Sequence, residues 1–206
     1  MRSRWVALGL VECLALAGCL SLRSPPVAAR LFVLEAVAAP AVGAAARPAG
    51  AAEGVAVGVG PLTVPDYAGS RLVHRVGPNE VRLSETEHWA EPLAVALQRV
   101  LVTNLAAVLA SERVVAHPWR PEVRPTWRIE IDVLRFERGP DGAADLEARW
   151  TLRRSRDLAL VRQATTRLAR APAGPGPDAL VAAFSASLAE WSAELAGALR
   201  EASATP

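Results

Sequence analysis

Two segments of alternating hydrophobicity constrain the fold of this chain more than any other feature of its sequence. Apolar residues occupy every second position of both: Trp127, Ile129, Ile131 and Val133 in the first segment, and Leu146, Ala148, Trp150 and Leu152 in the second. The residues between them are polar, mostly charged, so each segment predicts a strand with one buried and one polar face. The turn-forming sequence Gly139–Gly142 joins the two segments. Together they predict an antiparallel hairpin.

Two apolar stripes with helical spacing predict amphipathic helices. The first contains apolar residues at steps of three and four: Trp89, Leu93, Leu97, Val100, Leu101, Leu105, Val108 and Leu109. Pro92 falls in the first turn of this predicted helix, where a missing N–H costs nothing. The second stripe comprises Leu180, Phe184, Leu188, Trp191, Leu195 and Leu199. Asp178 lies at its start, where a carboxylate suits the free N–H groups of a helix.

Shorter apolar runs predict the remaining strands. They span residues 30–37, 54–64, 72–76, 80–83, 113–116 and 158–169. The tripeptide Gly77-Pro78-Asn79 predicts a turn, and residues 38–53, almost entirely Ala, Gly and Pro, predict a loop. This order of elements predicts an α+β fold: a single domain with a mostly antiparallel sheet and two amphipathic helices packed on one face.

The start of the chain has the pattern of a bacterial lipoprotein signal. Arg2 and Arg4 precede an apolar run, which ends in the lipobox Leu16, Ala17, Gly18 and Cys19. We therefore expect a signal peptide at residues 1–18, cleaved between Gly18 and Cys19, a lipidated tether at 19–30 and a folded domain at 31–206. The apolar run contains Glu12 and is shorter than the ~20 residues of a membrane-spanning helix. An ordinary secreted protein is the alternative.

Lipidation would attach diacylglycerol to the Cys19 thiol through a thioether. The residue after Cys19 is Leu20 and not the aspartate that retains many Gram-negative lipoproteins in the inner membrane. The expected location is therefore the outer membrane, on its periplasmic face. Cys13 would be lost with the leader, and the chain contains two cysteines. The mature protein would then form no disulfide and no cysteine-type zinc site.

Composition argues against nucleic-acid binding, because 23 basic residues, all arginine, nearly balance 21 acidic ones. Catalytic motifs are also missing: the sequence has no Gly-x-Ser-x-Gly elbow and no phosphate-binding glycine loop. The cluster Glu85, Glu87 and His88 could bind a metal, but a helix cap with a solvated turn is the favoured interpretation. We expect no enzyme activity, no catalytic or metal-binding residues, and no cofactor apart from acyl chains on Cys19.

The tryptophans admit two interpretations, carbohydrate stacking and core packing. Four of them lie on apolar stripes (Trp89, Trp127, Trp150 and Trp191), which favours core packing. Trp119, between Pro118 and Arg120, is the one expected to be exposed.

The order of motifs in the middle of the chain resembles the ABC-type transport auxiliary lipoproteins, the PqiC-like family. The segments that carry the resemblance are 57–67, 71–75, 77–83, 89–93, 104–105, 113–115 and 118–119. The resemblance picks out ten signature residues without assigned roles: Gly60, Pro61, Pro65, Tyr67, Arg75, Asn79, Trp89, Pro92, Asn104 and Trp119.

What the resemblance implies is a non-enzymatic component of an intermembrane lipid transport system. Such a lipoprotein, anchored by acyl chains such as palmitate, would dock an MCE-domain protein and its inner-membrane transport components at the outer membrane. A homo-oligomeric ring around the end of the transport tunnel is compatible with this role. The alternative is a structural lipoprotein that stabilises an outer-membrane assembly without a role in lipid traffic. A neighbouring gene for an MCE-domain protein would favour the first hypothesis.

Overall fold

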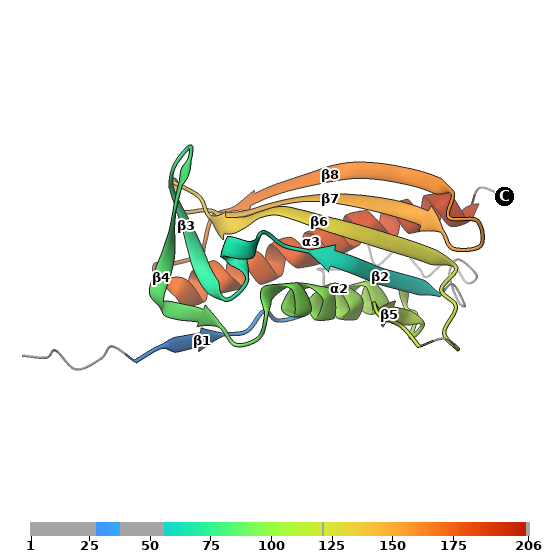
Figure 1. Cartoon of the computed structure of the whole chain (residues 1–206), viewed down its shortest axis with the longest axis horizontal. Helices are drawn as coiled ribbons and strands as arrows, with labels where there is room; N and C mark the ends of the chain where they lie inside the picture. Colours follow the sequence, from blue (N-terminus) through green and yellow to red (C-terminus); the bar gives the residue numbers. More distant parts are fainter. Residues whose placement is uncertain (1–27, 38–55, 121, 205–206) are drawn as a thin grey trace, which may run out of the picture.

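Strand β6 (Trp127–Arg138) pairs with three other strands and organises the sheet of this computed structural model, which describes residues 28–37, 56–120 and 122–204 (Figure 1). Its longest partner is β7 (Ala144–Arg154), which runs antiparallel with Ile129 opposite Leu152 and Ile131 opposite Trp150. These four side chains are buried. The hairpin predicted from the alternating pattern is confirmed.

The other described elements follow the predicted order. They are β1 (Arg30–Phe32), β2 (Val57–Thr63), the short 3-10 helix η2 (Asp66–Ala68), β3 (Arg71–Gly77), β4 (Glu80–Trp89), α2 (Leu93–Leu109), β5 (Val114–Ala116), β8 (Leu160–Arg170) and α3 (Pro177–Ala204). The described strands form one eight-stranded sheet. The predicted α+β class is therefore confirmed.

The pairing of the sheet is antiparallel in its two longest ladders, β6 with β7 and β7 with β8. Strand β2 instead lies parallel to both β5 and β6, and β1 lies parallel to β4. A parallel neighbour needs a crossover connection, and α2 supplies one between β2 and β5. Strand β3 also touches β6 in a parallel sense at one residue pair, His74 with Arg138. The sheet is thus mostly antiparallel by length of ladder, with the parallel pairing confined to shorter ladders.

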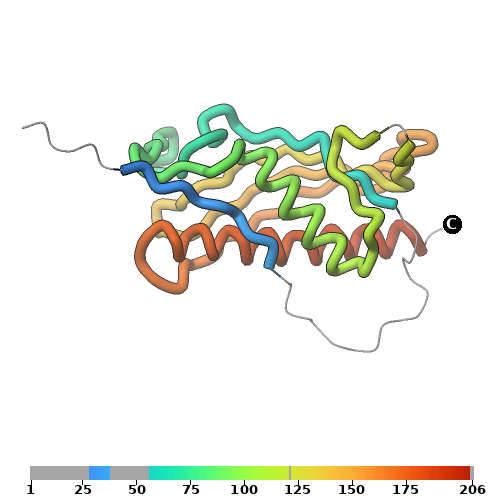
Figure 2. The backbone as a smooth tube through the Cα atoms, turned by 90° about the horizontal axis from the view of Figure 1, so that it is seen from below, coloured from blue at the N-terminus to red at the C-terminus, as the bar shows by residue number. Residues whose placement is uncertain are grey.

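Both helices cover the same face of the sheet, as Figure 2 shows from below, and the predicted layer arrangement is confirmed. The buried side chains of α2 and α3 form one core with the inward-facing residues of the strands. Within this core the rings of Phe136 and Phe184 stack at 4.1 Å, with Trp89 5.8 Å from Phe136. Burial of Trp89, Trp127, Trp150 and Trp191 confirms core packing as their role.

The start of the first helix differs from the prediction. Trp89 is the last residue of β4, and Pro92 is the N-cap residue before Leu93 begins α2. Trp89 shares a helical spacing with Leu93 and Leu97 because all three reach the same core, although Trp89 reaches it from a strand.

Helix α3 runs the full length of the domain, so its two ends mark the two ends of the molecule (Figure 1). Near its start, Arg30 of β1 forms an ion pair with Asp178 at 2.7 Å. Near its end, the indole of Trp127 donates to Ser203 at 3.2 Å. At about 1.5 Å per residue, the two contacts lie roughly 38 Å apart along the helix. The β1 side is called the chain-entry end below, and the opposite side the far end.

The predicted signal peptide, Cys19 with the lipobox, most of the tether and the predicted loop at 38–53 lie outside the described residues. Within the described ranges, neither helix has the length and apolar character needed to cross a membrane.

Candidate functional site

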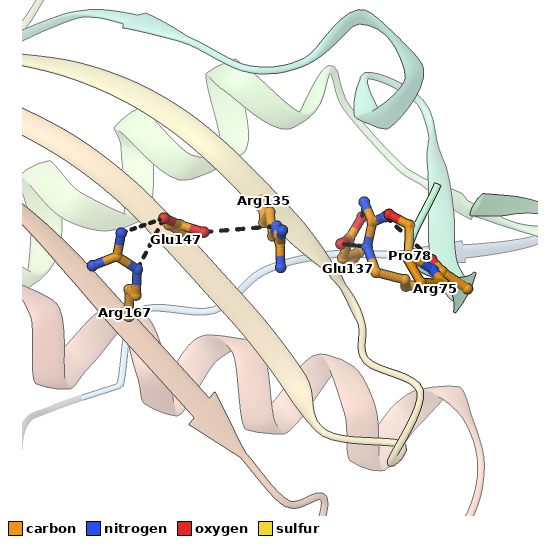
Figure 3. Close-up of polar contacts among 7 residues, drawn as sticks. Arg75, Pro78, Arg135, Glu137, Glu147 and Arg167 are labelled. Carbon is orange, nitrogen blue, oxygen red and sulfur yellow. Dashed lines mark hydrogen bonds and ion pairs between the residues drawn. The ribbon is translucent and has the colours of Figure 1, made fainter. Parts of the chain in front are cut away.

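Three signature residues gather at the chain-entry end, around the β3–β4 hairpin. Arg75 of β3 forms a two-pronged ion pair with Glu137 of β6: its Nε donates to Oε1, and its Nη2 donates to Oε2 at 3.1 Å (Figure 3). Its Nη1 also donates to the carbonyl of Pro78 at 3.2 Å. Asn79 is exposed in the turn that this contact holds, and Tyr67 of η2 lies beside the pair.

The Glu137 carboxylate is completely buried, with a side-chain exposure of 0%. The hydrogen bond from Arg75 to Glu137 raises the pKa of the guanidinium further above its ordinary value. Burial, followed by the negative charge of Glu137, raises the pKa of the Tyr67 phenol. Arg75 therefore stays charged and Tyr67 stays neutral. This arrangement holds the β3–β4 hairpin against β6.

The uncovered face of the sheet carries paired charges that run across the strands. Glu147 of β7 lies between Arg135 of β6, at 3.6 Å, and Arg167 of β8, at 2.9 Å (Figure 3). Glu130 and Arg153 pair in the same way at 3.1 Å. The polar half of the alternating pattern predicted this face, and its charges are solvated pairs of small energetic weight.

Gly60 and Pro61 belong to a junction between β2, α2 and the segment after β5. Gln98 of α2 donates from Nε2 to the carbonyls of Val59, at 2.7 Å, and His117, at 3.0 Å. A side chain on Gly60 would meet Gln98 Nε2 at 2.6 Å, and its φ of +108° suits glycine. The role of Gly60 is therefore to let this junction close.

Four other signature residues serve the core or its borders. Trp89 packs inside, and Pro92 ends the segment before α2. Asn104 is buried in α2, and its amide nitrogen has no hydrogen-bond partner among the described residues. Pro65 directly precedes η2 and accepts a backbone hydrogen bond from Ala68 at 2.9 Å.

Trp119 lies at the far end, on the face of β2 that carries Gly58. A side chain on Gly58 would come within 2.6 Å of the Trp119 ring, so the glycine makes room for the indole. The Arg128 guanidinium lies 5.1 Å above the same ring, and His117 meets it edge-on at 5.2 Å. Trp119 was expected to be exposed, but it is half-buried because Gly58, His117 and Arg128 pack around its ring; it is still less buried than the four core tryptophans.

Beside Trp119 lies a hollow of about 690 Å³ lined by arginines, which we call the arginine hollow. Its lining comprises Trp119, Val123, Arg124, Pro125, Thr126, Arg128, Arg154, Ser155 and Arg156. These residues come from the segment before β6, from the start of β6, and from the end of β7 with the turn that follows it. The chain therefore brings together four guanidinium groups from three places in the sequence.

Some of these arginines have partners and one has none within the described ranges. Arg128 donates from Nε to Ser155 at 3.2 Å. Asp157 lies 3.5 Å from Arg154 and 3.6 Å from Arg156. Arg124 is exposed and forms no ion pair or hydrogen bond with any described residue. The lining itself contains no carboxylate, so the hollow is positively charged and suited to an anion.

Sequence analysis did not identify the arginine hollow. The balanced composition indicated no basic surface, but it reports the total charge and not its distribution. The run Arg153-Arg154-Ser155-Arg156 was the available signal. It could not reveal that Arg124 and Arg128 lie opposite.

The predicted Glu85, Glu87 and His88 cluster lies in β4 and not at a helix start. Glu87 approaches His74 at 3.6 Å, and His88 Nε2 lies 3.3 Å from the carbonyl of Glu85. The expectation of a helix cap is therefore wrong, because the helix begins later. Among the described residues, no group of three or more His, Cys, Asp and Glu is placed to hold a metal ion.

Comparison with known families and structures places the chain among transport lipoproteins. The family model described as ABC-type transport auxiliary lipoprotein component matches residues 33–196. The crystal structure of protein XCC0632 from Xanthomonas campestris is similar, with a TM-score of 0.71 and 23% identity over 85% of this chain and 97% of that one. A crystal structure of an uncharacterized protein has a TM-score of 0.68 and 20% identity over 84% and 99%. These structures share the fold. No curated protein matches the chain.

Proposed function

Because the chain belongs to the family of ABC-type transport auxiliary lipoprotein components, we propose that it docks an intermembrane lipid transport assembly at the outer membrane. In this proposal the folded domain lies in the periplasm and the protein performs no catalysis. Its partners are an MCE-domain protein and the associated inner-membrane transport components.

The proposed anchor is the lipid attached to Cys19. Each buried methylene contributes about 0.8 kcal/mol, so two or three acyl chains such as palmitate hold a protein in a bilayer almost permanently. The proposed tether of residues 19–30 can span at most a few tens of ångströms, at roughly 3.3 Å per residue. The domain would therefore remain close to the membrane that holds its anchor.

The observation that carries this proposal is the separation of the two ends of the domain. The tether would join at the chain-entry end, where Arg30 pairs with Asp178. Trp119 and the arginine hollow lie at the far end: the hollow residues Pro125 and Thr126 directly precede Trp127, which donates to Ser203 near the end of α3. With one end held at the membrane, the other is free to meet a partner arriving across the periplasm.

A non-enzymatic role is supported by the chemistry of the arginine hollow. Its lining offers guanidinium groups, an indole and two hydroxyl groups, but no histidine, carboxylate or thiol. General acid–base catalysis needs a group that titrates near the working pH, and arginine does not.

Such a docking component would hold the end of the apolar transport tunnel at the target membrane, so that the acyl chains of a lipid stay shielded from water. An acyl chain exposed to water costs about 0.8 kcal/mol per methylene, so a lipid needs a continuous apolar route. A tethered domain that captures the end of an MCE tunnel would fix that end beside the bilayer. A homo-oligomeric ring of this chain stays a prediction, which native mass spectrometry of the purified protein tests.

The test is affinity purification from detergent-solubilised native membranes with a C-terminally tagged chain. Since α3 ends at the far end, the tag is placed behind a long flexible linker so that it does not cover the hollow. We expect an MCE-domain protein to co-purify with the tagged chain, and the chain to fractionate with the outer membrane. In the matched variant Cys19→Ala, the protein should leave the membrane fraction.

Two results would contradict the proposal. Recovery of outer-membrane or cell-wall components alone would favour the structural envelope lipoprotein. Retention of Cys19→Ala in the outer membrane, with the transport system fully active, would remove the anchor from the mechanism.

A further inference from the structure

We propose that the arginine hollow binds the phosphate group of an anionic phospholipid, with the acyl chains leaving along the apolar residues of the neighbouring turn. This inference rests on the proposed function only for the source of the lipid. The binding itself is argued from the residues that line the hollow.

The first argument is the excess of positive charge at one concave place. Arg124, Arg128, Arg154 and Arg156 line the hollow, and Asp157 is the carboxylate paired with two of them. Glu122 is exposed in the same segment as Arg124, without an ion pair among the described residues. Even when both carboxylates are counted, the guanidinium groups are in excess. The buried Nε atom of Arg154 has the 3.5 Å ion pair with Asp157 but no hydrogen bond to any described residue.

The second argument is the geometry of the arginine side chain. A guanidinium presents a planar fork of N–H donors, which matches two oxygens of a phosphate group. Arg124 has no described partner to release, and the pairs of Asp157 with Arg154 and Arg156 are long, at 3.5 and 3.6 Å. An incoming phosphate would therefore displace little existing bonding.

The third argument is the apolar surface beside the charge. Trp119, Val123 and Pro125 form part of the lining. The turn that contributes Ser155 and Arg156 continues into Leu158 and Leu160, which are 54% and 56% exposed. Free phosphate gains nothing from such neighbours, whereas a phospholipid places acyl chains next to its phosphate. Burial of those chains favours the lipid over the free ion.

The size of the hollow suits a lipid headgroup as its ligand, and not a protein partner with a flat surface. Sites for small molecules measure about 300–1,000 Å³ and combine apolar walls with a few polar groups. The arginine hollow, at about 690 Å³, has both properties. It would hold the headgroup and leave most of each acyl chain outside, for the partner or the membrane to cover.

The test measures binding of short-chain lipids to the full-length protein, purified from membranes in non-ionic detergent, by isothermal titration calorimetry. The ligands are dihexanoyl phosphatidylglycerol, dihexanoyl phosphatidylcholine, glycerol 3-phosphate and inorganic phosphate. We expect saturable binding of the phosphatidylglycerol, and weaker binding of the zwitterionic lipid and of the two ligands without chains.

The decisive variant is the double substitution Arg124→Gln with Arg156→Gln. Both side chains are exposed, so the thermal unfolding midpoint should remain unchanged. Loss of two charge-assisted contacts should weaken phosphatidylglycerol binding by about tenfold or more. The matched control, Arg71→Gln with Arg82→Gln, removes the same charge from exposed positions of β3 and β4 and should bind as the wild type does.

Three outcomes overturn the proposal. Equal weakening in both double variants would show that net charge, and not the hollow, attracts the lipid. Equal affinity for inorganic phosphate would make the site a free-phosphate site. Absence of saturable binding to any ligand would remove the site. None of these results depends on an MCE-domain partner, so the docking function and the lipid site can fail separately.

Discussion

Glu137 shows how one buried charge can determine a local structure. Its carboxylate is wholly buried, and Arg75 is its ion-pair partner. A buried charge that loses its partner costs far more than a surface pair contributes. Loss of Arg75 should therefore cost far more than an exposed ion pair contributes, because Glu137 would stay buried without its partner.

We predict that Arg75→Met lowers the free energy of unfolding by about 3–5 kcal/mol, because Glu137 remains buried without a partner. The second change, Glu137→Leu, should recover most of that loss in the double variant. Urea unfolding followed by tryptophan fluorescence measures both. The control Arg82→Met, at an exposed position of β4, should change the free energy by less than about 0.5 kcal/mol. Equal effects of Arg75→Met and Arg82→Met would contradict the assignment.

Asp145 should make stability depend on pH. Burial raises the pKa of Asp145, and the carboxylates of Asp141 and Glu137 act in the same direction. The folded protein therefore holds this proton at a higher pH than the unfolded chain does. Ionised Asp145 therefore lowers the free energy of unfolding. This destabilisation is absent below the ordinary aspartate pKa and fully present above the raised pKa of the folded protein.

The substitution Asp145→Asn removes this penalty. At neutral pH the variant should be more stable than the wild type, and the difference should vanish in strongly acidic solution. Urea unfolding at several pH values measures this dependence. A stability difference that grows as the pH falls would show that the sign of the argument is wrong.

At the scale of elements, burial patterns predicted which segments form the core but not which segments become neighbours. The alternation around Ile131 and Trp150 fixed the antiparallel hairpin, because a short turn leaves little choice of partner. The parallel pairing of β2 with β5 and β6 depends on the crossover through α2, which no local pattern encodes. Trp89 was placed in a helix because spacing reports burial and not backbone conformation.

The candidate site was less predictable for the same reason. Trp119 was expected to be exposed, but its neighbours Arg124, Arg128 and Arg154 come from different elements. The residues that flank Gly58 along the chain did not indicate that its missing side chain makes room for the Trp119 ring. Such a site becomes visible only when the pairing of the strands is known.

The junction held by Gln98 provides a test at this scale. Gly60→Ala forces a side chain against Gln98 and His117 at a φ of +108°, and should cost about 2 kcal/mol or more. In the background Gln98→Ala, the nearest clash is gone, so the added cost of Gly60→Ala should be smaller. Chemical denaturation of the four proteins gives this coupling energy.

Gly197→Ala is the control for this cycle. A side chain at Gly197 meets nothing within 4 Å, and its place inside α3 favours alanine. It should stabilise the protein by roughly 0.5–1 kcal/mol. Purely additive costs at Gly60 and Gln98 would show that the two residues do not act together.

At the scale of the whole molecule, the long axis along α3 separates two chemistries. The chain-entry end contains the buried Arg75–Glu137 ion pair and the connection toward the proposed anchor. The far end contains the arginine hollow, with an excess of guanidinium groups over carboxylates, and the exposed side chains of Leu158 and Leu160. Because the two ends differ, the orientation of the domain relative to the membrane determines which end faces a partner. Its function should therefore depend on which membrane holds the anchor, and not only on the folded domain.

Leu20 allows this dependence to be tested without touching the domain. In the general Gram-negative pattern, an aspartate after the lipidated cysteine retains a lipoprotein in the inner membrane. We predict that Leu20→Asp moves the protein from the outer- to the inner-membrane fraction of a sucrose gradient, whereas Leu20→Ala leaves it in place. Both variants should unfold at the wild-type temperature, because the proposed tether precedes the fold. Transport should fail in Leu20→Asp alone, since the far end would then point away from the inner membrane. Full transport activity from the inner membrane would refute a role that depends on direction.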